Sequence, residues 1–146
     1  MATKALVVTP HDYPPALNIV GEHVTVLASG EATEGYEFFL QRGPEGSGPP
    51  PHSHPWDESF YVIKGQIDFG IGAESTTASP GTFVHLPAGT EHWFRFGKGG
   101  GEMVSMTSRL GASKLFADIA RDVAPTNPGL GKLAEVGARH GLKLAV

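Results

Sequence analysis

Two histidines and a glutamate lie close together in the chain, with a spacing that suits metal binding. His52 and His54 are two residues apart, and Glu58 follows four residues after His54. In an extended strand, side chains at even spacing point to the same face. Two imidazole nitrogens and one carboxylate oxygen on a shared face are suitable ligands for a divalent metal. This segment therefore predicts most of a metal site, which the rest of the chain must complete and enclose.

Short strands are expected to position these side chains. The chain has 20 Gly and 12 Pro in 146 residues, which favours many turns. We interpret Lys64-Gly65 as a hairpin turn and Gly97–Gly101 as a flexible hairpin. A run of short strands separated by such turns is typical of an all-β sandwich or barrel. The expected strands are 6–9, 24–28, 36–42, 59–64, 66–70, 75–78, 82–86, 90–96 and 103–107.

The hydrophobic period changes after residue 108. One helix is expected over residues 113–121, with Leu115 and Ile119 on its apolar face. A second helix is expected from Asn127, as its cap, to about His140. We therefore expect a single domain with two parts. These are a β-barrel with an N-terminal arm, residues 1–108, and a helical tail packed on the barrel, residues 109–146.

A second segment has the spacing to supply a further metal ligand. It begins at Gly81, turns at Pro87-Ala-Gly89 and presents His92 at the start of the next strand. Phe96 follows four residues later.

Together the two segments resemble the paired motifs of the cupin family. The first motif, G-x5-H-x-H-x3-E-x6-G, is matched in full from Gly46 to Gly65. The second motif, G-x5-P-x-G-x2-H-x3-N, is matched from Gly81 onward, except that Phe96 replaces the final Asn. The resemblance covers roughly residues 35–108. It implies a double-stranded β-helix, or jelly-roll, barrel, here with a C-terminal pair of short helices.

The resemblance also implies that three histidines and a glutamate bind one divalent metal ion in the barrel mouth. Carried over to this chain, the ligands are His52, His54, Glu58 and His92. Nitrogen and oxygen ligands do not select among Fe, Mn, Ni, Co, Cu and Zn. Three neutral imidazoles and one carboxylate leave a net charge near +1 on the site, which favours an anionic or enolate-like ligand. No other cofactor is expected.

Alternation along the strands predicts the pocket wall. If Glu58 and His92 face inward, so do the residues two and four positions after each. On the earlier strand either Tyr36, Phe38 and Leu40 or Glu37, Phe39 and Gln41 face inward, and the second set is preferred. On the last strand the choice between Met103 with Ser105 and Val104 with Met106 stays open. The resulting pocket residues are Phe60, Val62, Phe94, Phe96, Phe39 and Gln41.

Other histidines and tryptophans have less specific interpretations. His85 is expected to face outward or to pack. Trp56 suits a cap over the mouth or a packing role. Trp93 is expected to point away from the metal, toward a second sheet or a partner subunit.

Composition narrows the partners and the compartment. The net charge is −4, and the basic residues are scattered singly, so we expect no nucleic-acid partner. No segment is long and apolar enough for a signal peptide or a membrane span. The absence of cysteine fits a reducing cytoplasm. Cupins of this size usually form dimers, so a homodimer is expected, with the proline-rich arm and Trp93 as candidate interface.

The resemblance implies a dioxygenase-like enzyme that acts on a small apolar, aromatic or enolisable molecule. Glu58 would be the catalytic residue, acting as a base toward a substrate hydroxyl. Two alternatives stay open: a metal-dependent isomerase or lyase working through an enolate, and a non-enzymatic module that binds a small molecule.

Overall fold

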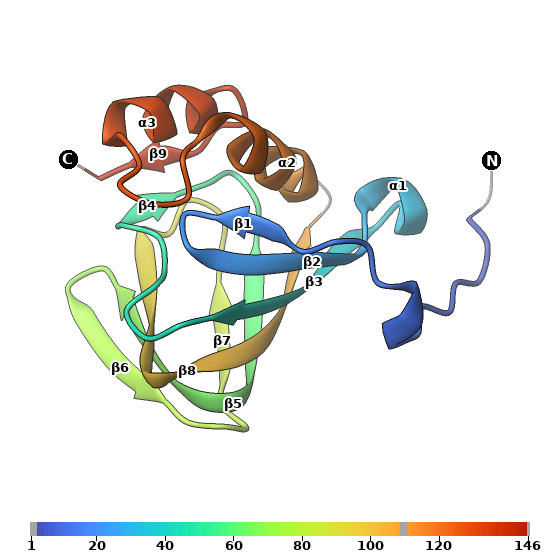
Figure 1. Cartoon of the computed structure of the whole chain (residues 1–146), viewed down its shortest axis with the longest axis horizontal. Coiled ribbons are helices and arrows are strands. Elements are labelled where there is room, and N and C mark those ends of the chain that lie inside the picture. The colour runs from blue at the N-terminus through green and yellow to red at the C-terminus, as the bar shows by residue number, and fades with distance from the viewer. Residues whose placement is uncertain (1–2, 109–110, 146) are drawn as a thin grey trace.

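The computed structural model describes residues 3–108 and 111–145. Its strands curl into a jelly-roll barrel, and the C-terminal helices lie over one end of it (Figure 1). One path through the sheet runs β1-β2-β3-β8-β4-β9, while β5 pairs with β6, β7 and β8. The strands are β1 (Leu17–Ile19), β2 (Glu22–Ala28), β3 (Tyr36–Gly43), β4 (His52–Ser53), β5 (Glu58–Ile71), β6 (Glu74–Ala78), β7 (Phe83–Leu86), β8 (His92–Ser108) and β9 (Lys143–Leu144). The helices are η1 (Pro10–Asp12), α1 (Gly30–Thr33), α2 (Ala112–Asp122) and α3 (Leu130–Ala138).

The two hairpin turns expected at Lys64-Gly65 and Gly97–Gly101 are wrong. Strands β5 and β8 pass through these glycines and pair with each other along most of their length. Gly65 lies opposite Gly101, and a Cβ on Gly65 would be 2.3 Å from the Gly100 carbonyl oxygen. Register shifts flank Gly65. The glycines thus permit close approach and irregular pairing of two long strands, a role that glycine has in strands as well as in turns.

Two other boundaries also differ from the expectation. The strand expected over 6–9 is absent, and this segment leads into η1, where Asp12 accepts a hydrogen bond from the Thr9 backbone N–H at 3.0 Å. Helix α3 is capped by Gly129 and begins at Leu130, because Asn127 adopts a left-handed backbone with φ 49°. The helix therefore starts later than Asn127-Pro128 predicted.

Alternation settles the two open choices of inward-facing residues. On β3, Glu37, Phe39 and Gln41 are all at most 2% exposed, whereas in the other set Tyr36 is exposed, Phe38 is half-buried and only Leu40 is buried. On the second half of β8, Met103 and Ser105 are buried, whereas Met106 is 43% exposed.

Two separate hydrophobic clusters hold the molecule together. The barrel cluster fills the interior of the barrel, and the tail cluster lies between the sheet and the C-terminal helices. The barrel cluster comprises Phe60, Val62, Ile67, Phe69, Ala78, Leu86, Phe94, Phe96 and Met103. The tail cluster comprises Ile19, Val24, Phe39, Trp56, Ala112, Leu115, Ile119, Val123, Leu133, Val136 and Leu142.

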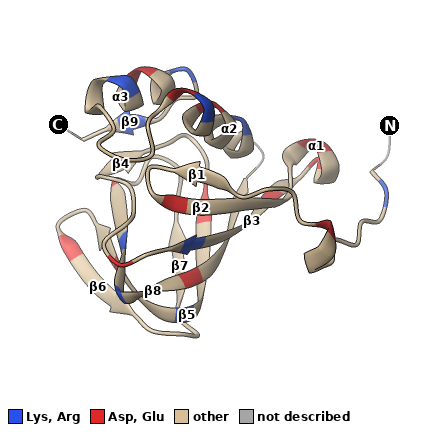
Figure 2. Cartoon of the chain, in the orientation of Figure 1, with Lys and Arg blue, Asp and Glu red and all other residues tan. Residues whose placement is uncertain are grey.

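The outer faces of the tail helices carry paired charges. Arg121 contacts Asp118 at 2.9 Å, and Arg139 contacts Asp122 at 3.6 Å. In the view of Figure 2, Lys and Arg are distributed singly rather than gathered into one stripe. Within residues 3–108 and 111–145, no helix has the length and apolarity needed to cross a membrane.

Candidate metal centre

Three strands bring the expected ligands to one point. His52 belongs to β4 and pairs in register with His92, the first residue of β8. His54 follows β4 by one residue, and Glu58 begins β5. One nitrogen from each of the three imidazoles lies within 4.8 Å of the others, and all three rings are buried. The local sequence therefore supplies histidines at strand ends that meet at one end of the barrel.

Each imidazole is oriented by a backbone carbonyl on its other side. The Nδ1 atoms of His52, His54 and His92 lie 2.8 Å, 3.1 Å and 2.8 Å from the carbonyl oxygens of Pro50, Trp56 and Thr90, respectively. Since a carbonyl only accepts, each Nδ1 carries the proton and donates it. Each Nε2 then points away from the backbone, and that of His54 meets the Glu58 carboxylate. Metal-binding histidines are typically held in this way.

Glu58 places a carboxylate beside this group of three histidines, next to His54 and His92. Its Oε1 is 3.1 Å from His54 Nε2 and 3.6 Å from His92 Nε2. Ligand atoms that bind one ion at right angles, each at about 2.1 Å, stand about 3 Å apart. The contact between Glu58 and His54 has this separation, so the carboxylate is placed to share an ion with His54.

Electrostatics keep His52 and Glu58 in their metal-binding forms at neutral pH. Burial, followed by the neighbouring His92, lowers the pKa of His52 to about 4. Burial alone would raise the pKa of Glu58, but interactions with His54 and His92 outweigh it and lower this pKa to about 2. A neutral imidazole and an ionised carboxylate are the protonation states that bind a metal.

One atom of the site is left without a partner by the protein alone. His92 is 1% exposed, and among the described residues its Nε2 has no hydrogen-bond partner. A buried polar atom without a partner is costly, and coordination to a cation satisfies it. The donor set, its orientation and this unpartnered nitrogen therefore fit a divalent metal ion.

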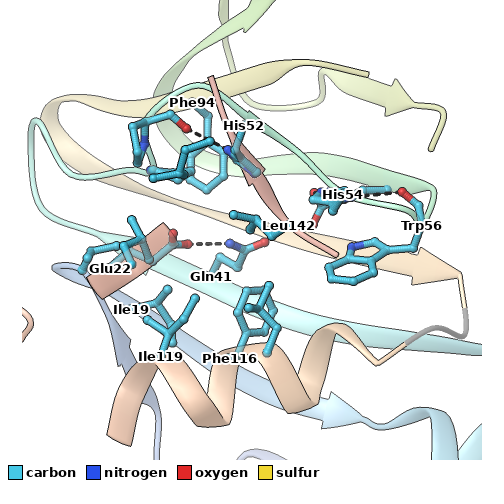
Figure 3. A pocket seen from close by; sticks show the side chains of 17 residues that line it. Ile19, Glu22, Gln41, His52, His54, Trp56, Phe94, Phe116, Ile119 and Leu142 are labelled. Carbon is cyan, nitrogen blue, oxygen red and sulfur yellow. Dashed lines mark hydrogen bonds and ion pairs between the residues drawn. The ribbon is translucent and has the colours of Figure 1, made fainter. Parts of the chain in front are cut away.

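The site opens into a small and mainly apolar cavity. Its volume is about 60 Å³, far below the 300–1,000 Å³ of sites for drug-sized ligands. In Figure 3, Glu22 and Gln41 lie across the middle of the view, between His52 with Phe94 on one side and Phe116 with Ile119 of the tail on the other. The lining consists of Ile19, Val20, Glu22, Gln41, Pro49, Pro50, His52, His54, Trp56, Glu58, Phe94, Leu115, Phe116, Ile119, Leu133, Leu142 and Leu144.

The six expected pocket residues are divided among three places. Gln41 and Phe94 line the cavity. Phe39 belongs to the tail cluster and packs edge-on against Phe116, with ring centroids 5.0 Å apart. Phe60, Val62 and Phe96 are buried in the barrel cluster, deeper along their strands than the metal ligands, and do not line the cavity.

Glu22 and the wall of the cavity that the tail forms were not predicted from the sequence. Glu22 lines the cavity and is only 3% exposed. Its position two residues before buried Val24 on β2 is an alternation signal that could have found it. The tail supplies most of the remaining wall, including Leu115, Leu133 and Leu142. The apolar stripe on the first tail helix predicts burial, but it does not say against what.

The remaining aromatic residues take distinct positions. Trp56 is 2% exposed, lines the cavity and stacks on His54, with centroids 4.6 Å apart and an interplanar angle of 11°. His85 is exposed and its Nδ1 lies 2.8 Å from the Ser59 hydroxyl, which confirms an outward position. Trp93 covers Gly70, where a Cβ would lie 1.9 Å from the indole nitrogen, and Arg95 lies 5.6 Å above its ring.

Comparisons with known proteins agree with this architecture. Residues 39–106 match the family described as "Cupin domain". Quercetin 2,3-dioxygenase of Bacillus subtilis is 31% identical over 72 residues, which are 48% of this chain but only 21% of that enzyme. The chain thus spans about one fifth of the length of this relative.

Solved structures share the fold at low sequence identity. KdgF from Halomonas sp. aligns with a TM-score of 0.68 at 18% identity, covering 76% of this chain and 99% of that one. The polyketide cyclase RemF from Streptomyces resistomycificus aligns with a TM-score of 0.61 at 16% identity, covering 72% and 80%. These structures support the fold, and the family match itself shows that residues 39–106 form a cupin domain.

Proposed function

We propose that this protein is a metal-dependent, dioxygenase-like enzyme that acts on a small apolar or enolisable molecule. The observation that carries the proposal is the convergence of three buried imidazoles on one point beside an apolar cavity. His52, His54, Glu58 and His92 would hold the ion. When bound, a divalent ion would supply a Lewis-acidic centre with free coordination positions for substrate oxygen.

The chain's own groups have distinct roles in this proposal. Glu58 stays ionised at neutral pH and would accept a proton from a substrate hydroxyl. The apolar side chains around the cavity would exclude water from the reacting groups. The similarity to a quercetin 2,3-dioxygenase supports oxygen chemistry. The small cavity volume favours a compact enolisable substrate over a large aromatic one.

Metal analysis and oxygen uptake test the proposal together. Protein loaded separately with Fe, Mn, Co, Ni, Cu or Zn should bind one ion per chain. At least one form should consume oxygen with a panel of small diketones and phenols. Chelated protein and His52→Ala serve as controls that should do neither. Tight binding of a panel member with no turnover under any metal would instead favour a binding module.

One observation favours an alternative reaction at the same site. Burial, opposed by the hydrogen bond from Gln41 and aided by the charge of Glu58, raises the pKa of Glu22 to about 8. A neutral carboxylic acid in the cavity is able to return a proton to an enolate, as an isomerase or lyase requires. Conversion of a diketone or hydroxyketone under strictly anaerobic conditions would support this reading against the dioxygenase.

A homodimer is proposed through the outer face of the sheet. Tyr61 and Phe83 lie opposite each other on β5 and β7 and are 48% and 64% exposed, and Ile63 and Met106 are also exposed. Apolar side chains clustered on adjacent strands are typical of interfaces. Light scattering should report a dimer at micromolar concentration, and Phe83→Glu should shift it toward monomer. A wild-type monomer would contradict the proposal.

A further inference from the structure

Two buried polar side chains of the cavity are not used by the metal ligands. Glu22 on β2 and Gln41 on β3 are 3% and 2% exposed, and both line the cavity. The Gln41 amide nitrogen donates a hydrogen bond to Glu22 Oε1. Within the described part of the chain this is the one hydrogen bond of either side chain, and Gln41 Oε1 is buried without a partner.

This arrangement is expensive if it is only structural. Burying a carboxyl group and an amide with one shared hydrogen bond leaves hydrogen-bonding capacity unused in an apolar surrounding. Leucine and phenylalanine side chains cover the same cavity from the tail, so apolar residues would fill this position without that cost. The pair thus provides a donor and an acceptor next to the site where a ligand would bind.

The pair offers complementary groups. In its neutral form the Glu22 carboxyl has an O–H that donates, and Gln41 Oε1 accepts. A hydroxyl group both accepts and donates one hydrogen bond, so it matches the two together. The other side chains that line the cavity, apart from the ligands and Trp56, are apolar.

We propose that Glu22 and Gln41 form a recognition pair that binds a hydroxyl or enol group of the molecule held at the metal centre. The ligand class is then a small molecule with two oxygen functions, an anionic one for the metal and a hydroxylated one for the pair, joined by a short apolar segment. This inference rests on the proposed metal site. The inference extends the proposed function by naming a hydroxyl group as the second chemical group that the substrate must carry.

The probes are propanoate and 3-hydroxypropanoate, which differ by one hydroxyl group. Their binding to the Co(II)-loaded protein is measured from the visible absorption of the cobalt ion, so the readout does not depend on turnover. Wild type should bind 3-hydroxypropanoate roughly three- to tenfold more tightly than propanoate. Glu22→Leu and Gln41→Leu should bring the ratio of the two affinities close to one, while the cobalt content stays at one ion per chain.

Glu22→Gln is the matched control, since it keeps a donor and an acceptor but cannot ionise. It should retain the preference, whereas wild type should lose it as the pH rises above about 8, because ionised Glu22 no longer has the O–H that donates to the ligand hydroxyl. The other titratable groups facing this space are Glu58 and the imidazoles of His52 and His54. Glu22→Gln shares all of these with wild type.

The outcomes separate the two proposals. Equal affinities for the two acids in wild type, or a preference that survives both leucine variants, would overturn the recognition pair while leaving the metal site standing. A wild-type protein that takes up no cobalt would overturn both.

Discussion

The barrel cluster and the tail cluster flank the candidate metal centre, and different parts of the chain build them. The barrel cluster comes entirely from strands between Phe60 and Met103, within the cupin domain. The tail cluster joins β1, β2, Phe39 of β3 and Trp56 to residues 112–142. The ligands lie between the clusters. The cupin strands thus determine where a metal would bind. The segments outside the domain determine how large the cavity beside that site is.

The strongest test of this division removes a ligand on the barrel side. His92→Ala should lower metal affinity by more than about a hundredfold, because even the outer partners of a metal ligand affect affinity by about 10–100-fold. Competition with a coloured chelator measures this. His85→Ala is the matched control, since His85 is exposed, lies in hydrogen-bonding contact with Ser59 and is not one of the proposed ligands. Equal affinities in the two variants would contradict the proposed ligand set.

A substitution in the tail cluster should affect stability and leave metal ligation intact. Leu115 is 2% exposed, and Leu115→Ala should lower the free energy of unfolding by about 3 kcal/mol. Exposed Lys114 provides the control, as Lys114→Ala should change it by less than about 0.5 kcal/mol.

The two tryptophans separate local from global unfolding in this experiment. Trp56 belongs to the tail cluster and Trp93 lies on the outside of the barrel over Gly70. In single-tryptophan variants, a tail that opens by itself would change Trp56 fluorescence before Trp93 fluorescence. Coincident transitions would show that tail and barrel unfold as one unit.

The same contrast explains what the sequence could predict. Alternation from Glu58 and His92 places Phe60 and Phe94 inward, because the period of a strand is two wherever it stays regular. It fails at Gly65 and Gly97–Gly101, where glycine serves a close approach of two strands instead of a turn. Local patterns contain no information about which distant surface covers a helix.

The cavity wall shows this limit most clearly. The apolar face of residues 113–121 was predicted, but its contact with the barrel mouth depends on the whole topology. Glu22 was missed for a related reason. Its alternation with Val24 is a signal of burial, but a lone glutamate at the start of a short strand is usually exposed, and the tail that packs over β1 and β2 is not visible in the local pattern.

The contribution of Glu22 to the free energy of unfolding should depend on pH. The pKa of Glu22 is raised from 4.5 to about 8 in the folded protein, chiefly by burial. Its neutral form therefore favours folding at low pH, and this contribution decreases as the pH rises from about 4.5 to about 8. Between about pH 6 and about pH 8, wild type should lose about 2 kcal/mol relative to Glu22→Gln, at about 1.4 kcal/mol per pH unit.

Urea unfolding of both proteins in the presence of a chelator measures this difference, since metal uptake would otherwise add its own pH dependence. Parallel stability curves over this range would mean that Glu22 titrates as in the unfolded chain. That result would remove the neutral acid from the cavity, and with it the support for proton return to an enolate.

The smallest expected change in stability comes from Ser105, inside the barrel, where its polar mouth meets its apolar interior. Ser105 is 1% exposed, lies opposite Phe39 and Phe60, and its hydroxyl has no partner among the described residues. Removing an unpartnered buried hydroxyl is nearly neutral or stabilising. Ser105→Ala should therefore raise the free energy of unfolding by between zero and about 1 kcal/mol, with no change in metal affinity or in the preference for 3-hydroxypropanoate.

Gln41→Leu makes this result informative, because Gln41 also carries an unpartnered buried oxygen. If both oxygens are only imperfections of packing, both variants should keep the preference between the two acids, although Gln41→Leu also removes the hydrogen bond to Glu22. If the oxygen of Gln41 serves a ligand, only Gln41→Leu should lose the preference between the two acids. A loss of more than about 1 kcal/mol in Ser105→Ala would show that this hydroxyl has a partner after all, and the polar mouth would then extend deeper into the barrel than the position of Phe60 indicates.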